Sequence, residues 1–309
     1  MAWGSFCEAT TKGRRSRLAL LLAALVALVA LGAGCAGDPP PPPSRTPAVE
    51  SPLEGSALVA MGTGAMTPLA HGLAEAYLQN GDAPVVVEES VGSGGGVRAV
   101  LEGAIDIGLL SRALNEREAG HGLIVAPIAR SAVVLGAHPR VRVEGLTSTE
   151  LVALVRGDKT TFADGRPAVM LLRDRDESAN AALEQQVPGL KSARDAAYTA
   201  NRLRVLYYDE AMLEGITSSP GGVGLIDLAF ASSARQPLKV LALDGMIPRR
   251  EDIASGRWRA TRELSFVYRP ERAARVSAFL AFVRSPKGRA VIDAMHAVPL
   301  PTLPSDIEP

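Results

Sequence analysis

The stretch VEESVGSGGGVRAVLEGAIDIGLLSRAL, Val87–Leu114, places four glycines and a serine between a β-branched run and an amphipathic run. The residues before the glycines predict a strand, the apolar positions Val97, Val100 and Leu101 predict a helix, and AIDIGLLS predicts a buried strand. A loop with so few side chains at the start of a helix either allows a tight turn or leaves backbone N–H groups free to hold an anion.

The same alternation extends toward the N-terminus. SALVAM and APVVVEES are expected to be strands, and TPLAHGLAEAYLQ between them has the apolar spacing of a helix. Thr67 is the expected N-cap of this helix, with Pro68 at its first position. Strands that alternate with helices at this spacing predict a parallel sheet with helical crossovers.

The later segments continue the pattern. Strands are expected at SAVVLGAH, AVMLLR, GGVGLIDLAF and LKVLALDG, and helices are expected at TSTELVALVRG and ERAARVSAFLAFV. Thr147 or Ser148 ahead of Glu150, and Ser285 ahead of Pro286, are typical signals for the start of a helix.

These elements predict an α/β fold with two lobes. The chain is expected to cross between the lobes near Ala129–Val134 and again near Leu238–Leu243. Lobe I would then consist of residues 56–131 plus 241–305, and lobe II of residues 132–240.

Residues 1–34 have the pattern of a signal peptide. A basic segment precedes the apolar run Leu18–Leu31, which is too short for a comfortable membrane span. The run ends in LGAGC, which resembles the lipobox of bacterial lipoproteins, so Cys35 is expected to be lipidated. Residues 35–55 would form the lipid attachment point and a proline-rich spacer. The alternative is an uncleaved anchor with Cys35 as a bystander.

Composition excludes several classes of protein. Aromatic residues make up 4% of the chain, which argues against base-stacking surfaces. Once residues 1–34 are removed, acidic residues slightly outnumber basic ones, so no electrostatic footprint for nucleic acid is expected. The second cysteine, Cys7, lies in the removed segment, so no disulfide is expected.

The histidines and the acidic cluster receive ordinary interpretations. The four histidines have no metal-ligand spacing, and we expect no metal or cofactor. Asp174, Asp176 and Glu177 are interpreted as part of a solvated loop, because two arginines are interleaved among them.

Three junctions combine small or hydroxyl residues with the start of a helix: GTGAMTP at Gly62–Pro68, VGSGGGV at Val91–Val97, and RDRDESAN at Arg173–Asn180. Ligands of open parallel sheets bind beyond the carboxyl ends of the strands, where helix N-termini favour anions. The middle junction matches neither the dinucleotide fingerprint, which requires glycine at Val97, nor a nucleophile elbow, which requires glycine at Val91.

The segments GTGAMTPL, GSGGGVRAVLEGAIDIGLLSR and RDRDESAN resemble motifs of the solute-binding proteins of bacterial phosphate ABC importers. PGGVGLIDLA, LALDGMIP, RELSFVY and FLAFVRSPKGRAVID resemble later blocks of that family in the same order, so the resemblance covers roughly residues 57–300. It implies a type II periplasmic binding fold, in which two lobes, each a mixed or parallel sheet flanked by helices, close on a ligand.

The resemblance also implies a set of ligand residues. In that family the arginine of the third junction lies four residues before the serine, but Asp174 stands there, so Arg173 or Arg175 must substitute. Some members have an acid where Arg112 stands. Carried over position by position, the implied ligand residues are Thr63, Gly64, Ala65, Ser93, Gly94, Ser111, Arg112, Arg173, Arg175, Ser178 and Asn180.

The expected function is that of a monomeric, lipid-anchored receptor in the cell envelope. It would bind phosphate or a similar oxyanion and deliver it to an ABC permease, without enzymatic activity, cofactor, metal or nucleic acid. The alternative is an adaptor or sensor partner of the same fold with weak or no phosphate binding, which the altered third junction favours. A hydrolase using Ser93 or Ser178 is the third possibility, but no base is suitably placed in the sequence.

Overall fold

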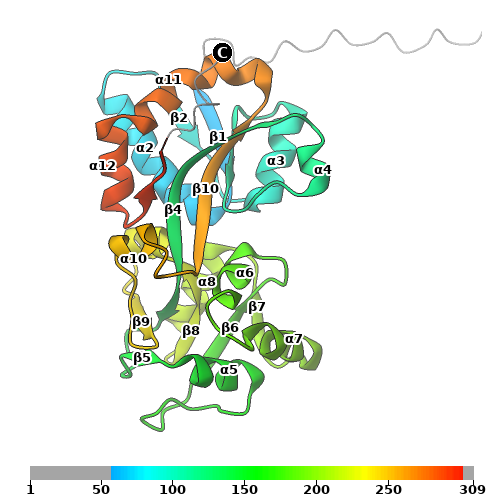
Figure 1. The fold of residues 1–309 in the computed structure, drawn as a ribbon, viewed down its shortest axis with the longest axis vertical. Helices are drawn as coiled ribbons and strands as arrows, with labels where there is room; N and C mark the ends of the chain where they lie inside the picture. Colours follow the sequence, from blue (N-terminus) through cyan, green and yellow to red (C-terminus); the bar gives the residue numbers. More distant parts are fainter. Residues whose placement is uncertain (1–56, 302–309) are drawn as a thin grey trace, which may run out of the picture. The chain divides into compact units, whose positions relative to one another are not determined.

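The computed structural model describes residues 57–301, which form an α/β fold (Figure 1). The expected signal peptide, the lipidated Cys35 and the proline-rich spacer lie outside the described residues. The strands are β1 Leu58–Gly62, β2 Val85–Val87, β3 Ile107–Leu110, β4 Ile124–Ala137, β5 Gly145–Leu146, β6 Val169–Arg173, β7 Arg204–Leu206, β8 Gly222–Asp227, β9 Lys239–Leu243, β10 Thr261–Tyr268 and β11 Val298–Pro299. The helices are η1 Gly64–Met66, α2 Thr67–Gln79, α3 Gly92–Glu102, α4 Glu116–Ala119, α5 Ser148–Arg156, α6 Ser178–Glu184, α7 Leu190–Ala200, α8 Asp209–Ser218, α9 Leu228–Ser233, α10 Arg250–Ala254, η2 Pro270–Arg272, α11 Ala273–Arg284 and α12 Pro286–Ala294.

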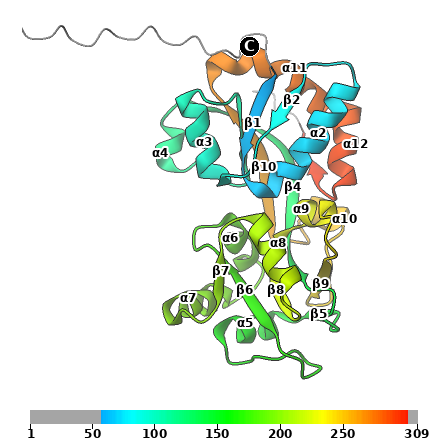
Figure 2. The same ribbon diagram turned by 180° about the vertical axis from the view of Figure 1, so that it is seen from behind.

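The sheet of lobe I has the order β2-β1-β3-β10-β4. β1 pairs in parallel with both β2 and β3, as the alternation of strands and helices predicts. β10 is antiparallel to β3 and to the first part of β4. The buried side chains of this sheet pack against α2, α11 and α12, which lie together in both views (Figures 1 and 2).

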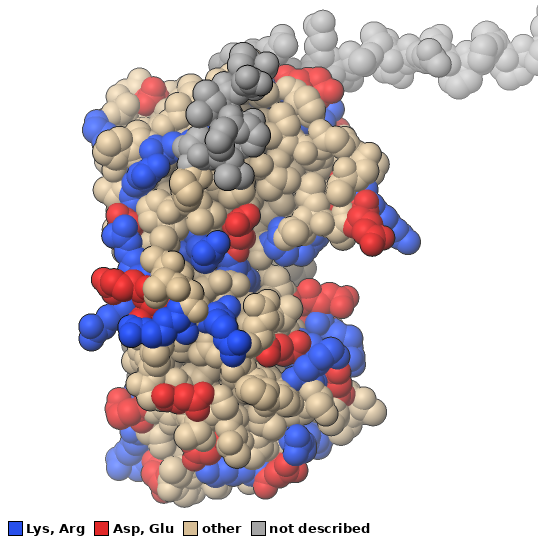
Figure 3. Space-filling view, viewed as in Figure 1, with Lys and Arg blue, Asp and Glu red and all other residues tan. Residues whose placement is uncertain are grey.

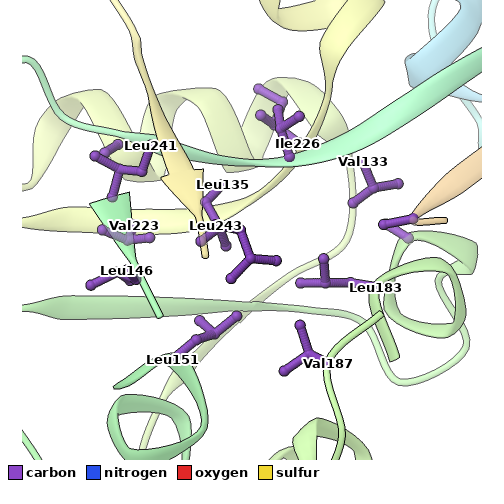
Figure 4. Close-up of a cluster of buried hydrophobic side chains, with 14 of the residues drawn as sticks. Val133, Leu135, Leu146, Leu151, Leu183, Val187, Val223, Ile226, Leu241 and Leu243 are labelled. Atoms are coloured by element: carbon purple, nitrogen blue, oxygen red, sulfur yellow. The ribbon is translucent and has the colours of Figure 1, made fainter. Parts of the chain in front are cut away.

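The sheet of lobe II continues from the second part of β4 through β8 and β6 to β7. Its apolar core includes Leu135 from β4, Val223 and Ile226 from β8, and Leu151 from α5 (Figure 4). β6 is parallel to β7 and to β8, while β4 is antiparallel to β8, so each lobe contains a mixed sheet.

Two long strands are shared by the lobes. β4 pairs with β10 along residues 124–132 and then with β8 along residues 133–137, so the chain passes from the first sheet to the second within this strand. The return crossing does not lie near Leu238–Leu243. These residues lead into β9, which pairs with β4 and β5 and places Leu241 and Leu243 in the lobe II core. The chain returns along β10 instead.

Helix start signals were predicted with mixed success. Thr147 caps α5 and forms a reciprocal capping box with Glu150, and Ser285 caps α12 by accepting a bond from the N–H of Gly288. Thr67 is not an N-cap, because a 3₁₀ turn precedes it and α2 already begins there. Its hydroxyl donates to the carbonyl of Thr63 at 3.2 Å, which ties the helix to the preceding turn.

The glycine run Gly92–Gly96 lies inside a helix rather than in a loop before it, because α3 begins at Gly92. A Cβ added at Gly96 would lie 2.7 Å from the carbonyl oxygen of Met61 and 2.9 Å from Cα of Gly62. The missing side chain therefore allows α3 to pack directly against the backbone of β1. Close packing, and not a turn, explains this glycine.

Two substitutions in α3 separate close packing from helix propensity. Gly96→Ala should destabilise the fold by about 1–3 kcal/mol, because the added methyl group meets backbone atoms that cannot move aside. Gly94→Ala should be neutral or stabilise by up to about 1 kcal/mol, because its Cβ would meet only the end of the Arg112 side chain, at 3.6 Å. Urea denaturation of both variants measures the difference. Equal stabilities would contradict the packing explanation.

Within residues 57–301, no helix is both long enough and apolar enough to cross a membrane.

Candidate functional site

Four hydroxyl side chains from separate segments meet at one place. The Oγ of Ser111 lies 3.1 Å from Oγ1 of Thr63 and 3.4 Å from Oγ of Ser178. The backbone N–H of Ser111 donates to Oγ of Ser93 at 3.3 Å. The structure thus brings together residues from all three junctions that the sequence singles out.

The topology explains this convergence. Thr63 follows β1 and Ser111 follows β3, and because these strands are parallel neighbours their carboxyl ends share one edge of the sheet. Ser93 lies in the first turn of α3, which packs on the same strands. Ser178 is the first residue of α6 in lobe II, so its contact with Ser111 joins the two lobes.

Arg173, the last residue of β6, is 1% exposed and lies against Glu177, the residue before Ser178. Its Nη2 atom lies 3.4 Å from Oδ2 of Asp209, 3.4 Å from Oε2 of Glu177 and 3.5 Å from the carbonyl of Tyr207. Its Nε and Nη1 atoms are buried without a hydrogen-bond partner among the described residues. Unpaired buried donors are costly, so this guanidinium has capacity to bind a further acceptor.

Arg175 lies in the opposite direction. Its side chain is 55% exposed, stacks over the ring of Tyr198 at 4.4 Å, and reaches Asp195 at 3.5 Å. Of the two arginines that the shifted register leaves open, only Arg173 contacts Glu177, which accepts a hydrogen bond from Ser178 of the hydroxyl cluster.

A second buried arginine, Arg262 of β10, belongs to the same cluster and was not predicted. Its Nη1 donates to Glu177 at 2.7 Å and to Ser178 Oγ at 3.3 Å, and its Nη2 donates to Asp227 at 3.0 Å. The alternation of side chains along a strand could have revealed it, because Arg262 lies two residues before Leu264 and therefore on the same inward face. A cation on an otherwise apolar strand face must have buried partners.

Asp227 anchors this arginine from the opposite side. The carboxylate is fully buried and accepts hydrogen bonds from the Ser131 hydroxyl at 2.6 Å and from the N–H of Ala229 at 3.0 Å. Burial raises the pKa of Asp227 even though Arg262 acts against this rise. Burial would lower the pKa of Arg262, but Asp227 and Glu177 outweigh it and raise that pKa above its ordinary value.

Glu177 corrects the interpretation of its segment as a solvated loop. Its side chain is only 19% exposed and lies between Arg173 and Arg262. Burial acts to raise its pKa, but the charges of Arg262 and Arg173 outweigh this and hold the pKa of Glu177 below its usual range. The sequence could not show that Glu177 pairs with Arg262, because Arg262 lies far along the chain in another element.

Arg112 borders the same region, but its charge is engaged elsewhere. Its Nη1 and Nη2 atoms donate to the two carboxylate oxygens of Glu118, at 2.6 and 2.8 Å. Glu118 also accepts the N–H of Asn115 in the capping box of α4. The hydrogen bonds from Arg112 lower the pKa of Glu118. Arg112 is therefore held at the rim as one half of an ion pair.

The other residues implied by the resemblance have different places. Asn180 donates from Nδ2 to the carbonyl of Asp174 at 2.6 Å, so it holds the loop rather than facing the hydroxyls. Ala65 is fully buried in η1. A Cβ at Gly64 would lie 3.1 Å from the carboxylate of Glu210, whose pKa is raised by burial and by neighbouring Asp209.

A cleft of about 210 Å³ opens beside this cluster. The residues that line it are Ser93, Gly94, Arg112, Asp174, Asp176, Glu177, Ser178, Tyr207 and Tyr208. Hydroxyl donors from both lobes and the guanidinium of Arg112 therefore border one small space together with three carboxylates, and such donors are the groups that recognise an oxyanion. No histidine lines it, and no cluster of metal-ligating side chains occurs within residues 57–301.

Tyr207 and Tyr208 stand at the mouth of the cleft, with 62% and 50% exposure. The charges on the visible face of the molecule alternate in sign without a single broad basic area (Figure 3). The face drawn there has no continuous basic track of the kind that a nucleic-acid backbone follows.

The comparison with known families agrees with this architecture. The model of the PBP (periplasmic binding protein) superfamily domain matches residues 41–287. The chain belongs to the PBP superfamily. This membership confirms the predicted two-lobed α/β fold of type II periplasmic binding proteins.

Several relatives of this PBP-superfamily chain are named as phosphate-binding proteins. The phosphate-binding protein PstS of Bacillus subtilis is 25% identical over 258 residues, which is 79% of this chain and 81% of the relative. A crystal structure of a putative phosphate ABC transporter substrate-binding protein with bound phosphate, from Clostridium perfringens, matches with TM-score 0.67 at 19% identity, over 80% of this chain and all of that one. The periplasmic molybdate-binding protein of Azotobacter vinelandii matches with TM-score 0.56 at 16% identity, over 79% of this chain and all of that one.

Proposed function

We propose that this protein is an extracytoplasmic solute-binding protein that takes up phosphate or a similar oxyanion in the cleft and delivers it to an ABC permease. The observation that carries the proposal is the meeting of four hydroxyls beside Glu177, against which Arg173 lies with its buried Nε and Nη1 atoms unpartnered among the described residues. Phosphate-binding relatives in two independent comparisons support the same ligand class.

The proposal includes a monomer that binds its solute without catalysis, cofactor or nucleic acid. The hydrolase alternative needs a general base beside a serine. Ser178 donates to Glu177 at 3.3 Å, but two arginines hold that carboxylate in its ionised form and withdraw its basicity. Binding and release is the chemistry that these contacts favour.

Calorimetric titration with phosphate, sulfate, molybdate and arsenate at neutral pH tests the proposal directly. Saturable binding of one of these oxyanions with 1:1 stoichiometry is the expected result. An absence of heat with all four would overturn the receptor and favour an adaptor of the same fold. The ground for an adaptor is the shifted arginine of the third junction, and it is weakened because Arg173 lies against Glu177, which lines the cleft.

The lipid anchor is a separate proposal, based on the LGAGC motif that ends at Cys35. Cys35→Ala should leave the protein unprocessed or release it from the membrane fraction, because acylation requires the thiol. Membrane fractionation and the size of the mature protein measure this outcome. A variant that is processed normally and stays attached to the membrane would exclude the anchor.

A further inference from the structure

The carboxylate of Glu177 uses the donors that an oxyanion site needs. Its Oε1 accepts from Nη1 of Arg262 at 2.7 Å and from the Ser178 hydroxyl at 3.3 Å, and its Oε2 lies 3.4 Å from Nη2 of Arg173. Two guanidiniums and a hydroxyl are typical ligands of a bound anion, and here a side chain of the protein engages them.

The buried charged groups around Glu177 already carry a net negative charge. Two cations, Arg173 and Arg262, face three carboxylates, those of Glu177, Asp209 and Asp227. A further anion entering this set would be repelled, and the repulsion is strong because these groups are largely removed from water. One carboxylate must therefore leave before an anion can bind tightly.

Glu177 is the carboxylate that can leave. Asp227 is 0% exposed and is fixed by the Ser131 hydroxyl and the N–H of Ala229. The side chain of Asp209 is 4% exposed, in the first turn of α8. Glu177 is 19% exposed, lines the cleft and precedes α6 with extended backbone, so rotation of its side chain would carry its carboxylate to solvent without moving the helix.

We infer that Glu177 determines the specificity of the cleft as an internal competitor, which an incoming oxyanion displaces from Arg173 and Arg262. This inference rests on the proposed function and names the group that the anion replaces. Once Glu177 has left, two guanidiniums and two carboxylates remain, and this set no longer repels an anion by its net charge. A monoanion attracts the two guanidiniums no more than the carboxylate that it replaces, whereas a dianion attracts them more strongly. Displacement therefore favours doubly charged oxyanions.

The test is calorimetric titration of the full mature protein with inorganic phosphate and with nitrate at neutral pH. Glu177→Gln keeps the size of the side chain and removes its charge, so phosphate should bind at least about tenfold more tightly than to the unmodified protein. Nitrate, which should not compete with the native glutamate, should bind measurably to the variant.

Glu116→Gln is the matched control. Glu116 of α4 is exposed, lies outside the residues that line the cleft, and its carboxylate forms no ion pair within residues 57–301. Loss of this charge should change the phosphate affinity by less than about threefold, as a screened surface charge does. A tenfold gain in this control as well would assign the effect to general electrostatics and overturn the inference.

The remaining outcomes distinguish the inference from the function on which it rests. Phosphate binding by the native protein with equal or weaker affinity in Glu177→Gln would overturn displacement and leave the receptor intact. No binding of phosphate, sulfate, molybdate or arsenate to either protein would overturn the receptor and the inference together. Should the glutamine variant fail to fold in a thermal melt, Glu177→Ala gives the same comparison.

Discussion

Arg173→Met should weaken phosphate binding by at least about tenfold, because a buried hydrogen bond to a charged group contributes about 1.5–3 kcal/mol. The expectation follows from the 1% exposure of Arg173 and from its two buried nitrogens without partners among the described residues. Calorimetric titration measures the affinity, and circular dichroism establishes that the variant is folded.

Arg175→Met is the matched control from the same loop. Because Arg175 stacks on Tyr198 and is largely exposed, its loss should change the affinity by less than about threefold. A larger loss with Arg175→Met than with Arg173→Met would show that the loop rearranges on binding and that the inward arginine of this structure is not the ligand.

Arg262→Met should lower the free energy of unfolding by about 3–5 kcal/mol, the usual result of removing one partner from a buried ion pair. The change leaves Asp227 buried without its cation and removes the shorter of the two arginine contacts to Glu177. For a domain of this size each kcal/mol lowers the melting temperature by about 2–4 °C, so calorimetric melting will resolve the loss. The exposed Arg259 supplies the control Arg259→Met, with little expected effect.

A second substitution tests the stated cause. Asp227→Asn combined with Arg262→Met removes the orphaned negative charge and should recover part of the lost stability. The loss in Arg262→Met should also shrink as the pH falls, because the pKa of Asp227 is already raised by burial and protonation neutralises it. A double variant no more stable than Arg262→Met would refute the charge explanation.

The sequence predicted the fold through local signals that do not depend on tertiary packing. The apolar spacing of residues 67–79 and the capping signals at Thr147 and Ser285 each gave a helix close to its observed position. The glycine run was misjudged for a physical reason. Gly96 packs against the backbone of a neighbouring strand, and the sequence around Gly96 does not show that this strand lies beside it.

The site residues that lie at the ends of strands or the starts of helices could be predicted from the sequence. Those that depend on contacts between distant elements could not. Ser93, Ser111 and Ser178 follow or open elements that are recognisable in the sequence, and the topology places them together. The position of Arg262, and with it the ion pair to Glu177, depends on the pairing of β10 with β3 and β4. The spacing of residues along the chain does not reveal this pairing. The choice between Arg173 and Arg175 needed the side-chain directions.

The two shared strands also determine the order in which each core becomes complete along the chain. All buried residues of the lobe II core lie between Ala132 and Ala260, in one uninterrupted segment. The lobe I core combines residues from Leu58 onward with residues as late as Ala297. During synthesis the second lobe therefore has its full set of core residues before the first, and a chain shortened at its C-terminus loses interior side chains mainly from the lobe that begins the sequence.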